Sequence, residues 1–326
     1  MYFEKKCIKL AKILVYLKNN VYIQKKSLLL LLTMKIKFLT FSCLFAASLF
    51  LVSCGEPKKN EEKADTTSAK TETKENLKKA LAEAPKPSEL PYQLQATGTE
   101  FNANIPNPHT NVEKYKTTNA KAALNLGVYA TDLGYLSAFQ KVQNGLDYVK
   151  AVKSLADKLG VSTALDPKMQ ERFEKNLKNV DTLSNIINDA IGKADGYLKN
   201  NKQANIATLI AAGTLVEGLY VATQIISTYP KDLLPEDAKN QILSGLVRII
   251  VDQQKTLGDV LSALKSLEKD EEVTKVIAQL EELQKIYGDL NIKEKLEKNQ
   301  GGALLTDKNI QGITNKVKEI RAQIIS

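Results

Sequence analysis

The sequence predicts an all-α protein, and two observations support this fold class. From Val112 to the C-terminus, apolar residues recur at steps of three and four, the spacing of one face of an α-helix. After position 112 there is no run of alternating, β-branched residues that would indicate a strand. We therefore expect a multi-helix bundle, or an α-solenoid-like array, of about seven to nine helices over residues 112–326.

The first half of this helical domain contains several residues that start or end helices. The expected helices cover residues 119–140, 146–159, a segment that starts at Asp166-Pro167, 181–198 and 206–226. Gly160 suits the C-cap of the second helix, and aspartate followed by proline suits the first positions of the third. The helix over 206–226 is the most apolar and ends before Tyr229-Pro230.

The second half predicts an antiparallel helical hairpin. A long helix starts at Pro235-Glu236, and its apolar residues recur at steps of three and four as far as Leu264. A second helix is expected from Val273 to Leu290. The short polar connection between two apolar seams is typical of helices that fold back on each other. The seams either pack on the core, which is their usual role, or offer a groove to another protein. A last helix is expected over 307–325.

A short internal sequence similarity occurs within two of these helices. Gly127-Val128-Tyr129 and Gly218-Leu219-Tyr220 both place a glycine two residues before a tyrosine. The similarity could reflect a duplicated unit, as in α-solenoids, but the residues that flank the two segments do not align. The simpler interpretation is close helix approach, since glycine costs a helix about 1 kcal/mol relative to alanine and needs a packing reason.

The most specific motif lies far upstream, in residues 34–57. Lys35 and Lys37 precede an apolar run over 38–50 that is too short for an ordinary transmembrane span. Leu51-Val52-Ser53-Cys54 follows, with Gly55 and polar residues behind it. This segment resembles the lipobox of bacterial lipoproteins. The alternatives are a chance cysteine, a secretory peptide cut elsewhere and a retained membrane anchor.

The lipobox resemblance implies a processed, lipid-anchored protein. Residues 34–53 would be the signal peptide, and Cys54 would become the diacylglyceryl-modified first residue. Because a targeting signal acts at an N-terminus, we expect residues 1–33 to be a non-native upstream extension. The alternative is a first membrane helix, which is disfavoured because its apolar runs contain lysines that cost roughly 2.5–3.5 kcal/mol each at a bilayer centre.

Removal of the leader changes the charge and the cysteine count. Residues 1–53 hold nine lysines and one glutamate, so they carry +8 of the formal net charge of +9. No basic cluster with interleaved aromatic residues remains, and we expect no nucleic-acid binding. Cys7 and Cys43 leave with the leader and Cys54 is acylated, so neither a disulfide nor a free thiol is expected.

Residues 54–111 are expected to form a disordered membrane tether. The segment is rich in Lys, Glu, Thr and Pro and has few apolar residues to offset the entropy of ordering it. Its prolines, from Pro85 to Pro108, disfavour long regular elements, and only a helical turn or two is expected over 76–84. A flexible chain of this length spans on the order of 40 Å.

The helical domain offers few residues for catalysis or for binding a cofactor. The one histidine of the chain, His109, falls in the expected tether. Zinc sites of the usual types, cysteine catalysis and a Ser-His-acid triad therefore lack their residues, and no glycine-rich nucleotide motif occurs. We expect no cofactor and no metal.

Three acids within apolar helical runs are the exceptions: Asp132, Asp195 and Glu217. A buried carboxylate is costly unless it is paired. One interpretation places each acid at a helix edge or in an ion pair with a basic residue, for which the candidates are Lys121, Lys193, Arg172 and Arg248. The other joins the acids in a pocket for a small polar ligand or cation, together with the neighbouring tyrosines Tyr129, Tyr135 and Tyr220.

Two functions remain open at this stage. The chain resembles all-helical lipoproteins of the Gram-negative envelope, which implies an anchor in the outer membrane and a helical domain that binds or scaffolds a protein or a small polar ligand. The alternative is an envelope hydrolase or a metal-dependent enzyme that uses only carboxylates. Acids converging in a solvent-reachable pocket would favour the enzyme, and tight pairing with lysine or arginine would favour the binding protein.

Overall fold

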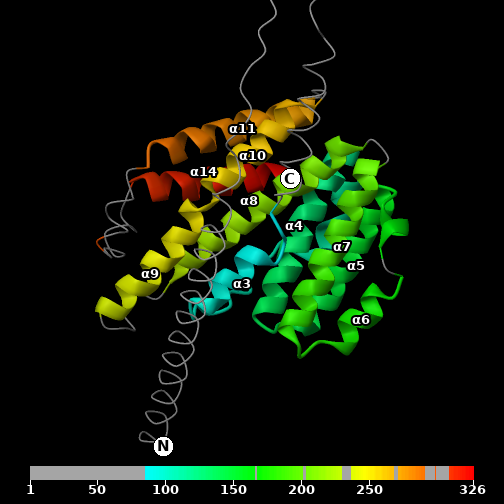
Figure 1. Ribbon diagram of the computed structural model, residues 1–326, viewed down its shortest axis with the longest axis horizontal. Coiled ribbons are helices and arrows are strands. Elements are labelled where there is room, and N and C mark those ends of the chain that lie inside the picture. Colours follow the sequence, from blue (N-terminus) through cyan, green and yellow to red (C-terminus); the bar gives the residue numbers. More distant parts are fainter. Residues whose placement is uncertain are drawn as a thin grey trace, which may run out of the picture. The chain divides into compact units, whose positions relative to one another are not determined.

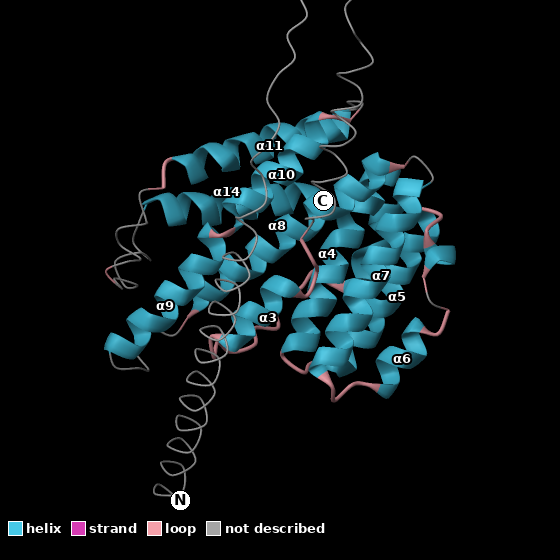
Figure 2. Cartoon of the chain, viewed as in Figure 1, coloured by secondary structure: helices cyan, strands magenta, loops and turns pink. Residues whose placement is uncertain are grey.

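The computed structural model describes residues 85–165, 167–200, 203–229, 236–267, 271–290, 298 and 308–326. Every regular element in these ranges is helical, which confirms the predicted all-α class (Figure 2). The α-helices are α3 (Glu89–Ala96), α4 (Asn119–Ala138), α5 (Val142–Lys158), α6 (Met169–Lys175), α7 (Val180–Asn200), α8 (Ala204–Thr228), α9 (Glu236–Val251), α10 (Gln253–Lys265), α11 (Glu271–Gly288) and α14 (Lys308–Ile324). Two 3-10 helices, η1 (His109–Lys116) and η2 (Ser162–Ala164), complete the set.

The helices α4 and α8 form the central pair of the bundle. Almost every residue of both is buried, including the polar residues Asn125, Asp132 and Glu217, because both helices are apolar around most of their circumference. The first and last described helices, α3 and α14, both contact this pair (Figure 1). In a solenoid each unit would contact only its neighbours in sequence, so this arrangement is a bundle around two core helices.

Glycine makes the contact between α4 and α8 possible. A Cβ atom on Gly213 would lie 2.0 Å from the carbonyl oxygen of Leu124, and one on Gly127 would lie 2.3 Å from that of Ile210. The interpretation of Gly127 as a site of close helix approach is therefore confirmed. Gly218 instead faces Leu90 of α3, where a Cβ atom would lie 2.6 Å from Leu90 Cδ1. Gly127 and Gly218 therefore allow contacts with different helices.

The predicted hairpin is present, but its first helix is interrupted. The single helix expected from position 235 is two helices, α9 and α10, with a break at Asp252. The hydroxyl of Tyr287 donates a hydrogen bond of 2.8 Å to the carbonyl oxygen of Ile250, one of the carbonyls that the end of α9 leaves free. Helices α10 and α11 form the hairpin and pack on α8 and α14, respectively, so its seams serve the core (Figure 1).

The other helix boundaries lie close to their predicted positions, with one exception. Gly160 follows α5 with a φ of +70°, as its expected C-cap role requires. The helix expected to open at Asp166-Pro167 starts later, at Met169, and position 166 lies outside the described residues.

The predicted tether is wrong for residues 85–111, which belong to the folded domain. Leu94 and Asn107 are fully buried, and α3 packs on both α4 and α8. The segment has few apolar residues, but Leu90, Leu94 and Ile105 are all buried, and its buried polar residues Thr99 and Asn107 are hydrogen-bonded. Cys54, the signal peptide and residues 54–84 lie outside the described residues.

Candidate functional site

The centre of the bundle contains an ion pair between Glu217 of α8 and Arg321 of α14. Arg321 Nε donates a hydrogen bond of 3.0 Å to Glu217 Oε2, and its Nη2 donates one of 3.1 Å to Oε1. Glu217 is 0% exposed and Arg321 is 9% exposed. Paired N–H groups that meet both carboxylate oxygens form the strongest geometry for an arginine–carboxylate contact.

Arg321 also makes contacts beyond Glu217. Its Nη2 donates a further bond of 3.3 Å to the carbonyl oxygen of Ile105, in the segment that precedes η1. Its guanidinium carbon lies 4.1 Å from the ring centre of Tyr220, close enough for a cation–π interaction. One side chain therefore connects the C-terminal helix, α8 and the segment after α3.

Asp132 of α4 is the second acid of this buried group. It is 0% exposed, and its Oδ2 accepts a hydrogen bond of 3.0 Å from the backbone N–H of Asn107. Its Oδ1 has no hydrogen-bond partner among the described residues. Burial and the neighbouring Glu217 carboxylate raise the pKa of Asp132 well above its ordinary value, and Arg321 only partly opposes this.

Tyrosines surround the acids and fasten the segment 102–108 to the bundle. The hydroxyls of Tyr129 and Tyr148 donate hydrogen bonds of 2.8 Å to the carbonyl oxygens of Pro108 and Asn107, respectively. Tyr115 donates one of 3.1 Å to the carbonyl oxygen of Ile325, just beyond α14. These hydroxyls supply hydrogen bonds to backbone carbonyl oxygens around the acids, and that of Pro108 also accepts one from the backbone N–H of Asn111.

The predicted site residues divide into three groups. Asp132 and Glu217 come together, with Tyr129 near them and Tyr220 on the guanidinium of Arg321. Tyr135 lies at the edge of this group, where it accepts a hydrogen bond of 2.9 Å from the backbone N–H of Asn102, and burial raises its pKa to about 12. Asp195 is on α7, is only half-buried, and does not join the two acids in the core.

For Glu217 the ion-pair interpretation is the correct one. Its partner is Arg321, which was not among the basic residues expected to pair with the acids. Arg321 was not among the predicted site residues, although the sequence contains a signal for it. Arg321 follows Val317 by four residues, on the apolar stripe of the last helix that also holds Ile313. A basic residue on a core-facing stripe needs an acid opposite it.

A groove of about 910 Å³ lies between α4, α11 and α14. Its floor contains the aliphatic side chains of Leu124, Val276, Ile320 and Ile324, and its rim contains the charged residues Lys121, Glu272, Lys275 and Glu319. Ala278 and Ala322 also line it and are exposed. One wall, α11, is the second helix of the predicted hairpin.

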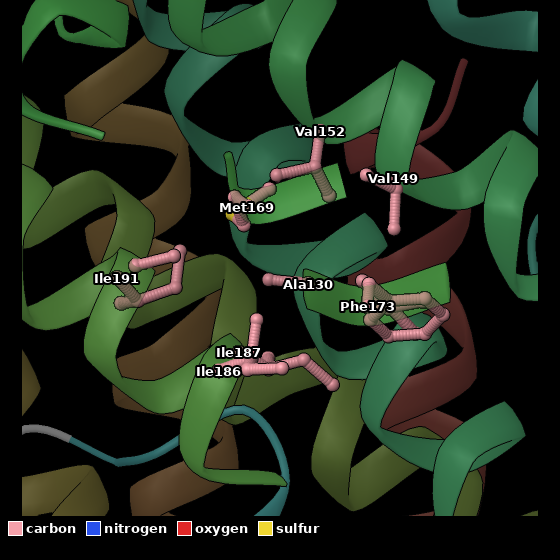
Figure 3. A pocket seen from close by; sticks show the side chains of 10 residues that line it. Ala130, Val149, Val152, Met169, Phe173, Ile186, Ile187 and Ile191 are labelled. Carbon is pink, nitrogen blue, oxygen red and sulfur yellow. The ribbon is translucent and has the colours of Figure 1, made fainter. Parts of the chain in front are cut away.

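A second hollow, between α4, α5, α6 and α7, is smaller and apolar. It measures about 10 Å³, and Figure 3 shows Ala130, Val149, Val152, Met169, Phe173, Ile186, Ile187 and Ile191 around it. This volume is about that of one water-sized sphere, and the lining carries no polar group to hold a ligand. We interpret the hollow as a packing gap.

Two further properties of the described residues bear on function. No cluster of three or more histidine, cysteine, aspartate or glutamate side chains that could hold a metal ion occurs among them. Within the same ranges α8 is the one helix long and apolar enough to cross a membrane, and 94% of its apolar window is buried inside the bundle.

No family model, curated protein or solved structure matches this chain.

Proposed function

We propose that the protein is a lipid-anchored lipoprotein of the cell envelope whose helical domain binds or scaffolds another protein, and that its core acids do not serve a hydrolase or a metal-dependent enzyme. The pairing and burial of Glu217 and Asp132 support the part of this proposal that concerns the acids. Both oxygens of Glu217 are bonded to Arg321, and neither Glu217 nor Asp132 reaches solvent. A hydrolase, or a metal ion held by carboxylates, needs acids that water and substrate can reach.

The anchor rests on the lipobox-like residues 51–54 and the apolar run before them. A single acyl chain binds a membrane only reversibly, so the multiple chains of a lipoprotein cysteine suit a stable outer-membrane location. The test is mass spectrometry of the mature N-terminus, with Cys54→Ala as the control. We expect a lipid-modified Cys54 as the first residue and an unprocessed or mislocalised Cys54→Ala chain. A mature chain that begins upstream of Cys54, or carries an unmodified Cys54, would contradict the anchor.

The groove between α4, α11 and α14 is the surface where we place the partner, an amphipathic helix of another protein. Ile320 and Ile324 lie four residues apart on its floor, the spacing that matches an apolar stripe on an incoming helix. The rim carries both signs of charge, with Lys121 and Lys275 alongside Glu272 and Glu319. Such a rim complements the mixed charges that flank the apolar face of a surface helix.

Capture from native membranes tests the groove. Ala278→Glu and Ala322→Glu each place a carboxylate over the groove at an exposed position. Ser262→Glu makes the same change at an exposed position of α10 outside the groove lining. We expect the wild type and Ser262→Glu to copurify the same protein, and both groove variants to lose at least about tenfold of it. Equal recovery with all four chains would rule out the groove.

A further inference from the structure

The buried group of Asp132, Glu217 and Arg321 is unbalanced in charge. It contains two carboxyl groups and one guanidinium, all from residues that are at most 9% exposed. The other titratable groups that face it are tyrosines: Tyr115 of η1, Tyr129 and Tyr135 of α4, Tyr148 of α5 and Tyr220 of α8. Burial raises the pKa of each of these hydroxyls, so all are neutral. With both acids ionised, the group would hold a net negative charge in the core, which is costly.

The hydrogen bonds show which of the two acids is less well supported as an anion. Glu217 receives two N–H bonds from Arg321, one on each oxygen. Asp132 receives one backbone N–H bond, on Oδ2, and its Oδ1 has no partner among the described residues. The Glu217 carboxylate acts directly on Asp132, but two carboxylates have no proton between them with which to form a hydrogen bond.

We propose that the core binds one proton, held on Oδ1 of Asp132 and donated in a hydrogen bond to the carboxylate of Glu217. This proton removes the excess negative charge and supplies the partner that Oδ1 lacks. The Asp132 carboxyl is then neutral, and Glu217 forms the ion pair with Arg321. Burial and the Glu217 carboxylate, which raise the pKa of Asp132, act in the same direction.

The bound proton makes stability depend on pH. The contribution of Asp132 is fully present below the ordinary pKa of an aspartate, where the folded and unfolded chains are both protonated. Above that value the unfolded chain releases the proton and the folded chain keeps it. The ratio of folded to unfolded protein then falls about tenfold for each pH unit, until the pH exceeds the raised pKa of the folded state.

Asp132→Asn tests the proposal because its amide copies a protonated carboxyl. The amide oxygen can accept the N–H of Asn107, and the amide nitrogen can donate to Glu217, but the side chain has no proton to lose. We expect urea unfolding of the full chain at pH 5, 6 and 7 to show the folded-to-unfolded ratio of Asp132→Asn rising about tenfold per unit relative to wild type. Exposed acids such as Asp147 and Glu271, whose pKa values are lowered by neighbouring lysines, are common to both chains and cancel in this comparison.

A constant difference between the two unfolding curves across this pH range would overturn the proposal. Infrared spectroscopy of the wild type gives a second test that does not depend on the variant folding. At pH 7 exposed acids are ionised, so we expect a carbonyl band from a protonated carboxyl that shifts in heavy water. A wild type without this band would also overturn the proposal.

Discussion

At the scale of single residues, Arg321 has more influence on the core than any residue singled out from the sequence. Its side chain contacts Glu217, the carbonyl oxygen of Ile105 and the ring of Tyr220. If the guanidinium were lost, two buried carboxyl groups would remain without a cation. The proximity of Asp132 makes the effects of changing Glu217 and Arg321 unequal.

We therefore expect Arg321→Met to be more destabilising than Glu217→Gln. Removing the cation of a buried ion pair costs about 3–5 kcal/mol of unfolding free energy. In Glu217→Gln the neighbouring Asp132 can ionise and compensate Arg321, so the cost falls to roughly 1–3 kcal/mol, that of a disrupted buried polar contact. Urea unfolding measures both, with Arg321→Lys as the control that keeps the charge and loses the paired N–H geometry. An equal cost for Arg321→Met and Glu217→Gln would contradict this ranking.

The sequence identified two of the three ionisable residues of this group, for a physical reason. Asp132 and Glu217 are conspicuous because each is an acid within an apolar helical run. The partner of Glu217 lies 104 residues away, and helix periodicity carries no information on which helices meet. Asp195 satisfied the same criterion as the other two acids but occupies a half-buried position on α7, since periodicity alone did not show how deeply α7 is covered.

At the scale of secondary-structure elements, the crossing of α4 and α8 determines how closely the core can pack. Gly213 approaches Leu124, and Gly127 approaches Ile210, at separations that only a residue without a Cβ atom allows. Gly192 of α7 differs from both, because a Cβ atom there would meet nothing within 4 Å.

We expect Gly213→Ala and Gly192→Ala to have opposite effects on stability. Alanine favours a helix by about 1 kcal/mol over glycine, and at position 192 this gain is expected almost in full. At position 213 the new methyl group would lie 2.0 Å from the Leu124 carbonyl oxygen, so the two helix backbones must separate. Overpacking of this kind costs roughly 1–3 kcal/mol. Thermal melts of both variants give the comparison, and a stabilised Gly213→Ala would show that α4 and α8 can move apart freely.

Periodicity predicted most helices to within a few residues, and the exceptions share a cause. The break at Asp252 interrupts an unbroken apolar rhythm, and the tertiary bond from Tyr287 to the carbonyl of Ile250 accompanies it. The helix α3 lies in a proline-containing stretch whose composition resembles a linker. In both places contacts from distant parts of the chain outweigh the local sequence signal.

At the scale of the whole molecule, the folded domain extends further toward the N-terminus than composition suggests. The described part begins at position 85, and α3 is held by Leu90 and Leu94 and by Ser88, whose hydroxyl lies 2.6 Å from that of Ser184 in α7. Sequence composition distinguishes a linker from a domain by average content. Average composition does not show whether a few apolar residues pack against other helices.

A pair of deletions tests where the domain begins. Removing residues 58–83 should change the melting temperature by no more than about 2 °C, because none of the packing of α3 is lost. Removing residues 58–96 also deletes Leu90 and Leu94, and the loss of each buried leucine costs about 2–5 kcal/mol. Circular dichroism melts distinguish the two. A large loss with the shorter deletion would show that residues 58–83 pack on the domain.

The ion pair between Glu217 and Arg321 also has a consequence for the timing of folding. Ribosomes add roughly 5–20 residues per second, so the 104 residues that separate the two positions take on the order of 5–20 s to synthesise. During that interval α8 contains Glu217 but not the cation that allows this carboxylate to be buried. The central pair can therefore complete its core only after the last helix has been made. Such a delay suits a chain proposed to be exported, since it keeps the nascent chain unfolded while it crosses the membrane.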